Sequence, residues 1–595
     1  MSAYVAPLKD MRFVLNELAG LAEVAKLPRF EEATPDTVDA ILEEASKFAS
    51  EVLDPINLSG DQEGSKLSDG EVRTPRGFRD AYRKFCDGGW NALPFEHEWG
   101  GQGLPRLVST PVQEMWKSSN LSFSLCPLLT QGAVEALLLR GSDALKQAYL
   151  PKMIEGRWTG TMNLTEPQAG SDLSLVRTRA ERRASEYLIS GQKIFITYGE
   201  HDLADNIVHL VLARTPDAPE GVKGISLFVV PKFIPDADGK AGRRNSARCA
   251  SIEHKLGIHA SPTAVMVYDQ AVGYLVGEEN RGLEYMFIMM NAARFAVGLE
   301  GVAIAERAFQ RALAFSRERL QGRDLVAGGK TVPIIRHPDV RRMLMLMKSQ
   351  AEAMRALAYT TAAAMDFAHK SGNPAERRRH QAYVDLMIPV VKGWSTETGI
   401  EIASLGVQVH GGMGFVEETG AAQYLRDARI TTIYEGTTGI QAMDLVGRKI
   451  AREGGETAKE WIAQLKQFEA QLSKSNNENL VALRSQFAAG VQALADCVEF
   501  IVASSAKDPR PAFAGAVPFL KLMGIVAGGW QMGRAALAAE RTLQSGERSF
   551  LEAKIATARF YADHVLVQAP ALRNTVVNGA AGVMALSEDQ FLAAY

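Results

Sequence analysis

The sequence predicts an α+β protein whose folded units follow the order helical, β, helical, helical. The first observation is length, because 595 residues are several times the roughly 100–200 residues of an ordinary domain. The second is composition, because 46% hydrophobic and 23% charged residues are typical of a folded protein. The third is the hydrophobic period, which is helical, changes to short β-rich runs and becomes helical again. This order differs from the βαβ alternation of a nicotinamide-binding Rossmann sheet.

Changes of pattern along the chain predict five segments. Residues 1–34 are an N-terminal extension, and 35–156 are a helical domain with apolar residues at helical spacing. Residues 157–278 are a β domain, either a barrel or a sandwich, because short runs rich in Val, Ile and Phe are bounded there by Gly, Pro or Asp. Long helical patterns return over 279–452, and a further helical domain occupies 453–595.

Charge and hydropathy argue against two classes of partner. The net charge of -3 gives no overall field that would attract nucleic acid, and 451–595 carries 14 basic and 14 acidic residues. The apolar windows near 125–139 and 515–530 are shorter than the ~20 residues needed to cross a bilayer, so we expect no integral membrane segment. Peripheral membrane attachment through 517–526 stays an alternative, although a buried helix explains the same residues.

The cysteines and the N-terminus predict a cytoplasmic protein. Cys86, Cys126, Cys249 and Cys497 are far apart and have no C-x-x-C spacing, so we expect neither a disulfide framework nor a metal site. The first ten residues carry charge early and lack an apolar core followed by a small-residue cleavage site, so we expect no secretory signal.

Two stretches at the entry to the β domain suit a cofactor. In Met162–Asp172, Thr165 supplies a hydroxyl donor and Ala-Gly-Ser at 169–171 permits close backbone approach, which suits a planar polar ring and a pyrophosphate. A polar turn that caps a strand explains these residues equally well. Further on, strand alternation places Phe195 and Thr197 on one face, able to stack on a ring and donate to its edge. Alone, this second stretch is only a strand.

A carboxylate late in the helical region is a candidate general base. Glu435 stands in a Tyr-Glu-Gly turn flanked by apolar Ile433 and Tyr434, so it is placed to be partly desolvated and poised as a base. For an isolated glutamate, a solvated surface position is the alternative. The nearest approach to a G-x-G-x-x-G loop is Gly411–Gly414, which lacks the last glycine in register, so any redox cofactor is held in another way.

Taken together, these stretches resemble the acyl-CoA dehydrogenase family. The matching segments run in the family's order across about 160–440: Leu164–Asp172, Phe195–Thr197, Lys255–Gly257, Arg294, Arg319–Gly322, Gln408–Gly414 and Tyr434–Thr437. The extra C-terminal segment and the opening Tyr4–Phe13 are similar to a longer bacterial subgroup, which includes enzymes of a sulfur-containing acyl chain. The resemblance implies a helical N-terminal domain, a central β-barrel or sandwich and a four-helix bundle, with an additional C-terminal helical domain.

The resemblance implies FAD-dependent formation of a trans-2,3 double bond in an acyl-CoA thioester. Glu435 matches the base that removes the α-proton, while the β-hydrogen leaves as a hydride to flavin N5. In the family, the thioester oxygen is held by the backbone N–H of the base residue and by a flavin hydroxyl, an oxyanion-hole arrangement. Some members place the base just before the arginine matched by Arg294. Ala293 occupies that position here, which favours Glu435.

The resemblance also implies the ligand contacts. The residues matched to FAD contacts are Leu164, Thr165, Gly170, Ser171, Phe195, Thr197, Arg319, Gln321, Gln408, Gly411, Gly412 and Thr437. Those matched to substrate contacts are Ser171, Arg294, Tyr434 and Gly436. Five of the FAD residues, from Arg319 to Gly412, match residues that reach the dinucleotide of a neighbouring subunit, which implies a homodimer. Gly322-Arg323 stands where Phe-Gly is frequent, and Gly439 stands where glutamine is common, so the adenine-side contacts are expected to differ.

The resemblance implies an electron-transfer flavoprotein as electron acceptor. An acyl-CoA oxidase, which passes electrons to O₂, is the alternative within the class. The subgroup implies 3-methylmercaptopropionyl-CoA as substrate, with a medium- or long-chain fatty acyl-CoA of β-oxidation as the alternative. A flavin-containing DNA-associated protein on the same scaffold is the alternative from a different class. The neutral balance of 451–595 and the intact Tyr434–Thr437 disfavour it.

Overall fold

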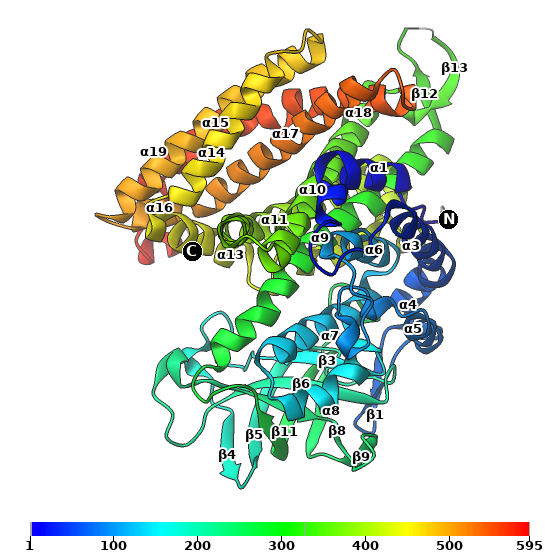
Figure 1. The fold of residues 1–595 in the computed structure, drawn as a ribbon. Helices are drawn as coiled ribbons and strands as arrows, with labels where there is room; N and C mark the ends of the chain where they lie inside the picture. Colours follow the sequence, from blue (N-terminus) through cyan, green and yellow to red (C-terminus); the bar gives the residue numbers. More distant parts are fainter. Residues whose placement is uncertain (1–2, 327, 594–595) are drawn as a thin grey trace. The chain divides into compact units, whose positions relative to one another are not determined.

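A computed structural model describes residues 3–326 and 328–593, which divide into two compact units (Figure 1). One unit contains 3–6 and 32–296, and the other contains 7–31 and the chain from Val297 onward. The division falls within one long helix, α9 (Gly282–Glu318). The α+β class predicted from the sequence is confirmed, because the first unit contains a large sheet and the second is mainly helical.

The first unit begins with a helical layer around an aromatic core. Its helices are α3 (Pro35–Phe48), α4 (Asn57–Glu63), α5 (Phe78–Asp87), α6 (Arg106–Ser119), α7 (Leu121–Arg140) and α8 (Asp143–Ile154). The first of these starts at Thr34, whose hydroxyl accepts the Thr37 N–H and so satisfies one free donor of the helix end. Phe48 of α3 and Trp90 each meet Trp116 edge to face, with ring centroids 5.1 and 5.2 Å apart. These edge-to-face contacts stabilise the layer beyond the apolar area that they bury.

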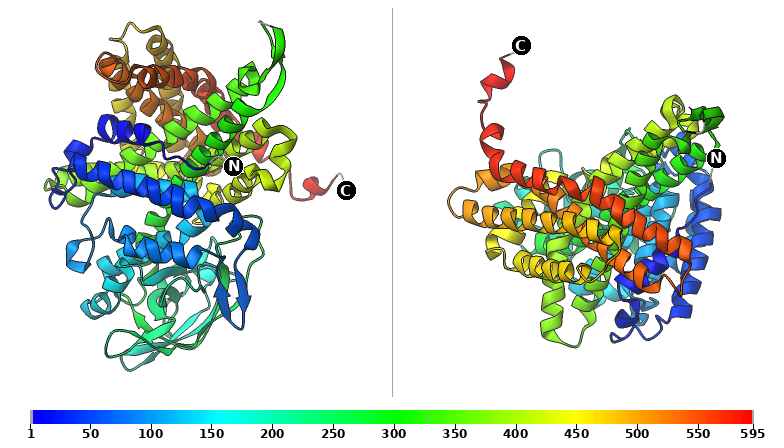
Figure 2. Two further views of the ribbon diagram at one scale, coloured as in Figure 1. Left: turned by 90° about the vertical axis from the view of Figure 1, so that its right-hand side faces the viewer. Right: turned by 90° about the horizontal axis from the view of Figure 1, so that it is seen from above.

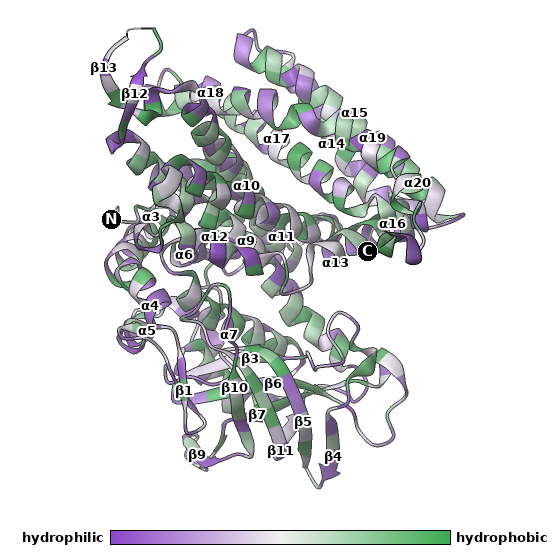
Figure 3. Cartoon of the chain, turned by 180° about the vertical axis from the view of Figure 1, so that it is seen from behind, coloured by the Kyte–Doolittle hydropathy of each residue, from purple (hydrophilic) through white to green (hydrophobic). Residues whose placement is uncertain are grey.

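The β domain is one seven-stranded sheet. Its strands are β3 (Trp158–Asn163), β4 (Arg179–Arg183), β5 (Glu186–Thr197), β6 (Asn206–Ala213), β7 (Ser226–Pro231), β10 (Ala247–Ile252) and β11 (Thr263–Leu275). They run in the order β3-β6-β7-β11-β5-β4, with β10 also paired to β11. The β3–β6 pair is parallel and the others are antiparallel. Every residue of β6 and β7 is buried, which explains their mainly apolar sequences (Figure 3). Two short pairs complete this unit: β1 (Lys66–Ser68) with β2 (Glu71–Arg73), and β8 (Phe233–Pro235) with β9 (Ala241–Arg244).

The second unit is built on long helices. They are α9 from Val297 onward, α10 (Pro338–Lys370) and α11 (Pro374–His410), followed by the shorter α12 (Ala421–Thr431) and α13 (Thr438–Met443). A hairpin of β12 (Leu320–Asp324) and β13 (Gly328–Pro333) follows α9. Two glycines bring α9 close to α11. A Cβ at Gly298 or Gly301 would lie 2.6 or 2.3 Å from a backbone oxygen of α11. Only glycine permits this approach of the two helices.

The C-terminal addition packs onto the same unit. It contains α14 (Glu456–Leu472), α15 (Glu478–Ser505), α16 (Arg510–Ala514), α17 (Ala516–Thr542), α18 (Arg548–His564), α19 (Ala569–Asn578) and α20 (Ala580–Val583). Figure 2 shows its longer helices side by side. α17 lies against α11, where a Cβ at Gly524 would come within 2.1 Å of the Trp394 ring. The addition is therefore seated on the helical bundle by close helix contact.

Three described helices are long and apolar enough to cross a membrane: α7, α9 and α15. The sequence-based expectation that no apolar segment reaches this length is therefore wrong: α7 extends beyond the window at 125–139, and α9 and α15 lie outside both windows that stand out in the sequence. Within the protein, 83% of the apolar window of α7 and 72% of that of α9 is buried. Within 517–526, the alternative segment for membrane attachment, Phe519, Leu522 and Val526 are fully buried, which favours the explanation as a buried helix.

A buried ionic cluster ties the N-terminal extension to the helices of the second unit. Asp10 of α1 (Leu8–Phe13) accepts a 2.6 Å bond from Arg355 of α10 and contacts Lys554 of α18. Arg355 also bonds Glu306 at 2.8 Å, and Lys554 also bonds Glu352 at 3.0 Å. Burial opposes ionisation of Asp10, but Lys554 and Arg355 outweigh it and hold its pKa well below the usual range. Residues distant in sequence are thereby linked in one charge network.

Replacing Asp10 with asparagine is expected to lower the free energy of unfolding by about 1–3 kcal/mol. This loss of stability is smaller than that expected when a buried ion pair is broken completely, because Arg355 keeps its bond to Glu306 and Lys554 keeps its bond to Glu352. Urea denaturation of the full chain measures it. Lys9→Gln is the matched control, since its ion pair with Glu547 is exposed and contributes little. An Asp10 variant as stable as the Lys9 variant would contradict this account.

Candidate active site

The predicted base lies in a tight turn between α12 and α13. Glu435 has a backbone φ of 56°, and the following Gly436 has a φ of 89°. A left-handed backbone is costly for a residue other than glycine and persists only where the surroundings enforce it. The turn ends at Thr437, whose hydroxyl accepts the N–H of Ile440 and caps α13. Glu435 itself is half-buried. Strain of this kind is concentrated at functional sites, which fits the position of a base.

Two side chains that sequence reasoning missed hold this turn. Lys392 of α11 donates from Nζ to the carbonyl oxygen of Gly436 at 2.7 Å. Gln441 of α13 donates from Nε2 to the carbonyls of Glu435 and Gly436, at 3.1 and 3.3 Å. Both side chains belong to residues that are 0% exposed. One feature of the sequence could have indicated that Lys392 is buried. It directly follows the apolar run 386–391, so this part of the helix has no polar face on which a lysine would be solvated.

Tyr434, predicted to contact substrate, uses its hydroxyl within the protein. The hydroxyl donates to the carboxylate of Glu300, a fully buried residue of α9. Burial, followed by the charge of Glu300, raises the pKa of Tyr434 well above its usual value. The phenol is therefore held neutral as a donor. Gly436, also predicted to contact substrate, lies in the turn itself.

A buried ion pair shapes the first predicted flavin segment, which follows β3. Lys193 donates to Glu166 at 2.8 Å and to the carbonyl of Leu164 at 3.0 Å. The carboxylate also accepts the backbone N–H groups of Arg177 and Thr178 and the Thr178 hydroxyl. Burial would raise the pKa of Glu166, but Lys193 and these hydrogen bonds hold it at about 2. The backbone from Leu164 to Glu166 is thus fixed from inside the domain.

The remaining residues of this segment are open to a ligand. Thr165 is half-buried, and its carbonyl accepts the N–H of Ile194. Gly170 and Ser171 are exposed, and a Cβ at Gly170 would meet no atom within 4 Å. Open backbone beside a hydroxyl donor fits the pyrophosphate and ring edge of a flavin dinucleotide.

A β-bulge presents Phe195. Ile194 and Phe195 together face Val265 of β11, because the pairing shifts between Ala264 and Met266, and Phe195 has a φ of 60°. The Phe195 ring is 60% exposed, although it sits in a strand. Ile196 is buried, and Thr197 is half-buried on the outward side. A bulge of this kind redirects side chains next to active sites. An exposed ring beside a hydroxyl fits the isoalloxazine of FAD.

The residues predicted to reach a neighbouring subunit's cofactor are all exposed. Arg319 and Gln321 lie at the start of the β12–β13 hairpin, which projects beyond α9 and α10 (Figure 1). Gln408, Gly411 and Gly412 lie where α11 ends, and Thr437, predicted at the adenosine side, is exposed as well. Large apolar side chains stand nearby in each segment: Leu325, Val326 and Phe415 are 78%, 97% and 89% exposed.

Two other polar residues near the predicted site are held by packing. Arg294, predicted to contact substrate, is 4% exposed and lies over the ring of Phe287 at 5.9 Å. The preceding Ala293 is buried and offers no proton acceptor at the alternative base position. His410 stacks on Phe315 with ring centroids 4.4 Å apart and bonds a backbone carbonyl through Nδ1. Burial also lowers the pKa of His410.

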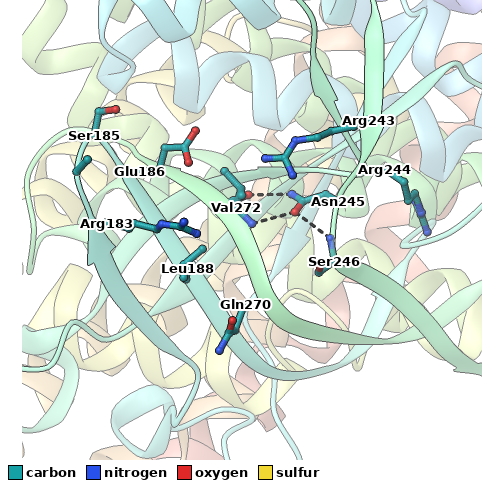
Figure 4. A pocket seen from close by; sticks show the side chains of 11 residues that line it. Arg183, Ser185, Glu186, Leu188, Arg243, Arg244, Asn245, Ser246, Gln270 and Val272 are labelled. Atoms are coloured by element: carbon teal, nitrogen blue, oxygen red, sulfur yellow. Dashed lines mark hydrogen bonds between the residues drawn. The ribbon is translucent and has the colours of Figure 1, made fainter.

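A polar cavity of about 480 Å³ lies elsewhere on the β domain (Figure 4). Arg183 of β4 and Arg243 of β9 point toward it. Asn245 supports its wall by bonding both the N–H and the carbonyl of Val272. None of the predicted cofactor, substrate or catalytic residues is in its lining. The cavity is therefore distinct from the predicted site.

Four family models match the chain in order. "Acyl-CoA dehydrogenase, N-terminal domain" matches 35–157, "Acyl-CoA dehydrogenase, middle domain" matches 161–271, and "Acyl-CoA dehydrogenase, C-terminal domain" matches 280–451. "Acetyl-CoA dehydrogenase C-terminal like" matches 461–587, within the C-terminal addition.

Named relatives span nearly the whole chain. A 3-methylmercaptopropionyl-CoA dehydrogenase of Ruegeria pomeroyi is 51% identical, covering 97% of this chain and 98% of that protein. A butyryl-CoA dehydrogenase of Syntrophomonas wolfei is 34% identical, covering 95% of each. The structure of an acyl-CoA dehydrogenase complexed with FAD from Bacillus anthracis shares the fold, with a TM-score of 0.74 at 19% identity, covering 98% of this chain and 93% of that one.

Proposed function

The chain belongs to the acyl-CoA dehydrogenase family, and we propose from this premise that its substrate is 3-methylmercaptopropionyl-CoA. The predicted fold, enzyme class and cofactor are confirmed: it is an FAD-dependent acyl-CoA dehydrogenase. The observation that carries the proposed substrate is the identity to the Ruegeria enzyme, which is well above that to the butyryl-CoA enzyme over similar lengths.

In the proposed mechanism, Glu435 removes the α-proton of the thioester. The thioester carbonyl acidifies the α-carbon, and the carboxylate takes its proton onto an oxygen. FAD, when bound, would supply the acceptor for the β-hydrogen and its electron pair, so that loss of the α-proton and of this hydride would leave a C2–C3 double bond. Lys392 and Gln441 keep the turn of Glu435 in its left-handed conformation. A fixed base reacts faster than a mobile one, because the entropy of orientation is already lost.

The residues around the β-domain entry would hold the cofactor. The backbone at Leu164 and Thr165 would meet the ring edge, and Gly170 and Ser171 would meet the pyrophosphate. Phe195 and Thr197 would contact the ring. These cofactor contacts are supported by the open backbone at Gly170, the exposed Phe195 and the half-buried Thr165 and Thr197, which carry hydroxyls.

Anaerobic bleaching of the flavin across a panel of acyl-CoA thioesters tests the substrate. We expect 3-methylmercaptopropionyl-CoA to give the highest apparent second-order rate constant for bleaching, above those of straight chains of C4 to C16. Because one methylene in an apolar pocket is worth only ~10–200-fold, the C5 chain, which has a methylene in place of the sulfur, is the sharpest comparison. A higher rate with any straight chain would overturn the proposed substrate and leave the enzyme class intact.

We further propose that the enzyme is a cytoplasmic homodimer that passes electrons to an electron-transfer flavoprotein. The exposed Gln321, Phe415 and their neighbours support a dimer, because exposed apolar side chains beside predicted cofactor contacts suit a subunit interface. The four cysteines are free, which suits a reducing compartment. Light scattering of the holoenzyme tests the dimer. Abundant peroxide in air, with slow anaerobic turnover of a one-electron dye, would favour an oxidase.

A further inference from the structure

The carbonyls of the catalytic turn point toward two buried donors rather than toward water. Lys392 reaches Gly436 from α11, and Gln441 reaches Glu435 and Gly436 from α13. A lysine side chain is among the costliest groups to bury, so a fully buried one is expected only where it makes a defined interaction. Here its Nζ contacts the residue that directly follows the predicted base.

Lys392 is fully buried, and α17 packs closely against α11 at the two residues that follow it. A Cβ at the adjacent Gly393 would lie 2.5 Å from Leu520 of α17 and 3.4 Å from Gln441. Trp394, the next residue of α11, packs against Gly524 and Gly528 of α17. A Cβ added to either glycine would lie 2.1 or 2.8 Å from the Trp394 ring. The C-terminal addition therefore closes the space behind the helical turn that carries Lys392.

We propose that Lys392 is a positioning residue for the dehydrogenation, which keeps Glu435 at the α-carbon by tethering the Gly436 carbonyl. A left-handed φ at Glu435 is strained, and the tether keeps the strained turn populated. Gln441 is the second, weaker tether, because its two bonds are longer. The C-terminal addition supports this tether, because its helix α17 packs against α11, which carries Lys392, and against α13, which carries Gln441. This inference rests on the proposed role of Glu435.

Lys392→Met tests the proposal in the full-length holoenzyme, because it removes the donor at similar side-chain length. We expect anaerobic flavin bleaching to slow ~100-fold, the cost of a misplacement near 1 Å. Flavin content and the Kd for the enoyl-CoA product should stay near wild type. The isotope effect of α-deuterated substrate should be kept or increased, because proton removal becomes slower. A loss of rate without this isotope effect would indicate a general structural role and overturn the proposal.

Lys521→Met is the matched control. Lys521 also bonds α11, through Glu401 at 3.1 Å, but it lies in α17 and is not bonded to the turn. We expect its bleaching rate to match wild type. If Lys392→Met also matches it while Glu435→Gln is inactive, the tether is unnecessary and only this inference fails. If Glu435→Gln also keeps the wild-type rate, the proposed base itself is wrong.

Gln441→Leu covers the case in which Lys392→Met does not fold. It removes the weaker tether and leaves the Lys392–Gly436 bond in place. We expect bleaching to slow about tenfold, again with the α-deuterium isotope effect retained. A wild-type rate in a folded Gln441 variant would overturn the view that tethering of these carbonyls positions the base.

Discussion

Glu435→Gln is expected to abolish turnover while leaving the fold and the bound flavin intact. Glutamine has nearly the same volume and can adopt the same turn, so the contacts of Lys392 and Gln441 with the backbone persist. The amide cannot accept the α-proton, and loss of a general base costs about 10²–10⁴-fold or more in rate. Anaerobic flavin bleaching with saturating substrate measures the chemical step. The flavin absorbance and the unfolding midpoint check that cofactor and fold are retained.

The matched control for this prediction is Glu418→Gln. Glu418 is an exposed carboxylate of the same helical unit, so its replacement changes charge equally and should leave the rate unchanged. A Glu435→Gln enzyme that bleaches its flavin at the wild-type rate would require another base. The position before Arg294 cannot supply it, because Ala293 has no ionisable group.

Much of the fold could be predicted from the sequence because it depends on local patterns. The change from helical to β spacing locates the sheet, and the turn around Glu435 is visible as polar residues between helical runs. Alternation alone, however, would place Lys193 on the same face as Phe195 and Thr197. The structure buries Lys193 and exposes Phe195, because the bulge at 194–195 inserts an extra residue. A bulge depends on the partner strand, which local sequence does not specify.

The supports of the site could not be predicted because they join distant residues. A lysine in a helix is usually solvated, and only the fold reveals that Lys392 is fully buried and donates to the Gly436 carbonyl. The same holds for Asp10, whose partner Lys554 lies at the opposite end of the chain. Motifs therefore indicate which residues contact ligands, whereas the residues that hold those motifs in place emerge from packing.

Lys193→Met is expected to lower the free energy of unfolding by about 3–5 kcal/mol, because it leaves the carboxylate of Glu166 buried without its cation. Three hydrogen bonds from Arg177 and Thr178 remain, so we expect the lower end of this range. The variant also loses the bond to the Leu164 carbonyl, which fixes the start of the predicted flavin segment. Flavin affinity should fall together with stability. Urea denaturation and flavin fluorescence measure the two effects.

The double variant Lys193→Met with Glu166→Gln separates charge from packing. It removes the uncompensated carboxylate and keeps an oxygen that accepts from Thr178, so stability should recover in part. Flavin affinity should stay low, because the Leu164 carbonyl still lacks its donor. If the double variant were no more stable than Lys193→Met, the cost would come from lost packing rather than from the buried charge.

The pH dependence of this loss has a definite sign. In the wild type, the pKa of Glu166 is about 2, below its ordinary 4.5, so the pair stabilises the fold above pH 4.5 and this contribution is lost as the pH falls toward 2. Without Lys193, only the hydrogen bonds from Arg177 and Thr178 oppose the effect of burial, so we expect the pKa of Glu166 to be higher in the variant than in the wild type, and protonation then removes the buried charge as the pH falls. The stability difference between wild type and variant should therefore shrink from pH 7 toward pH 4. A constant difference over this range would mean that removal of Lys193 does not raise the pKa of Glu166, and would contradict this account.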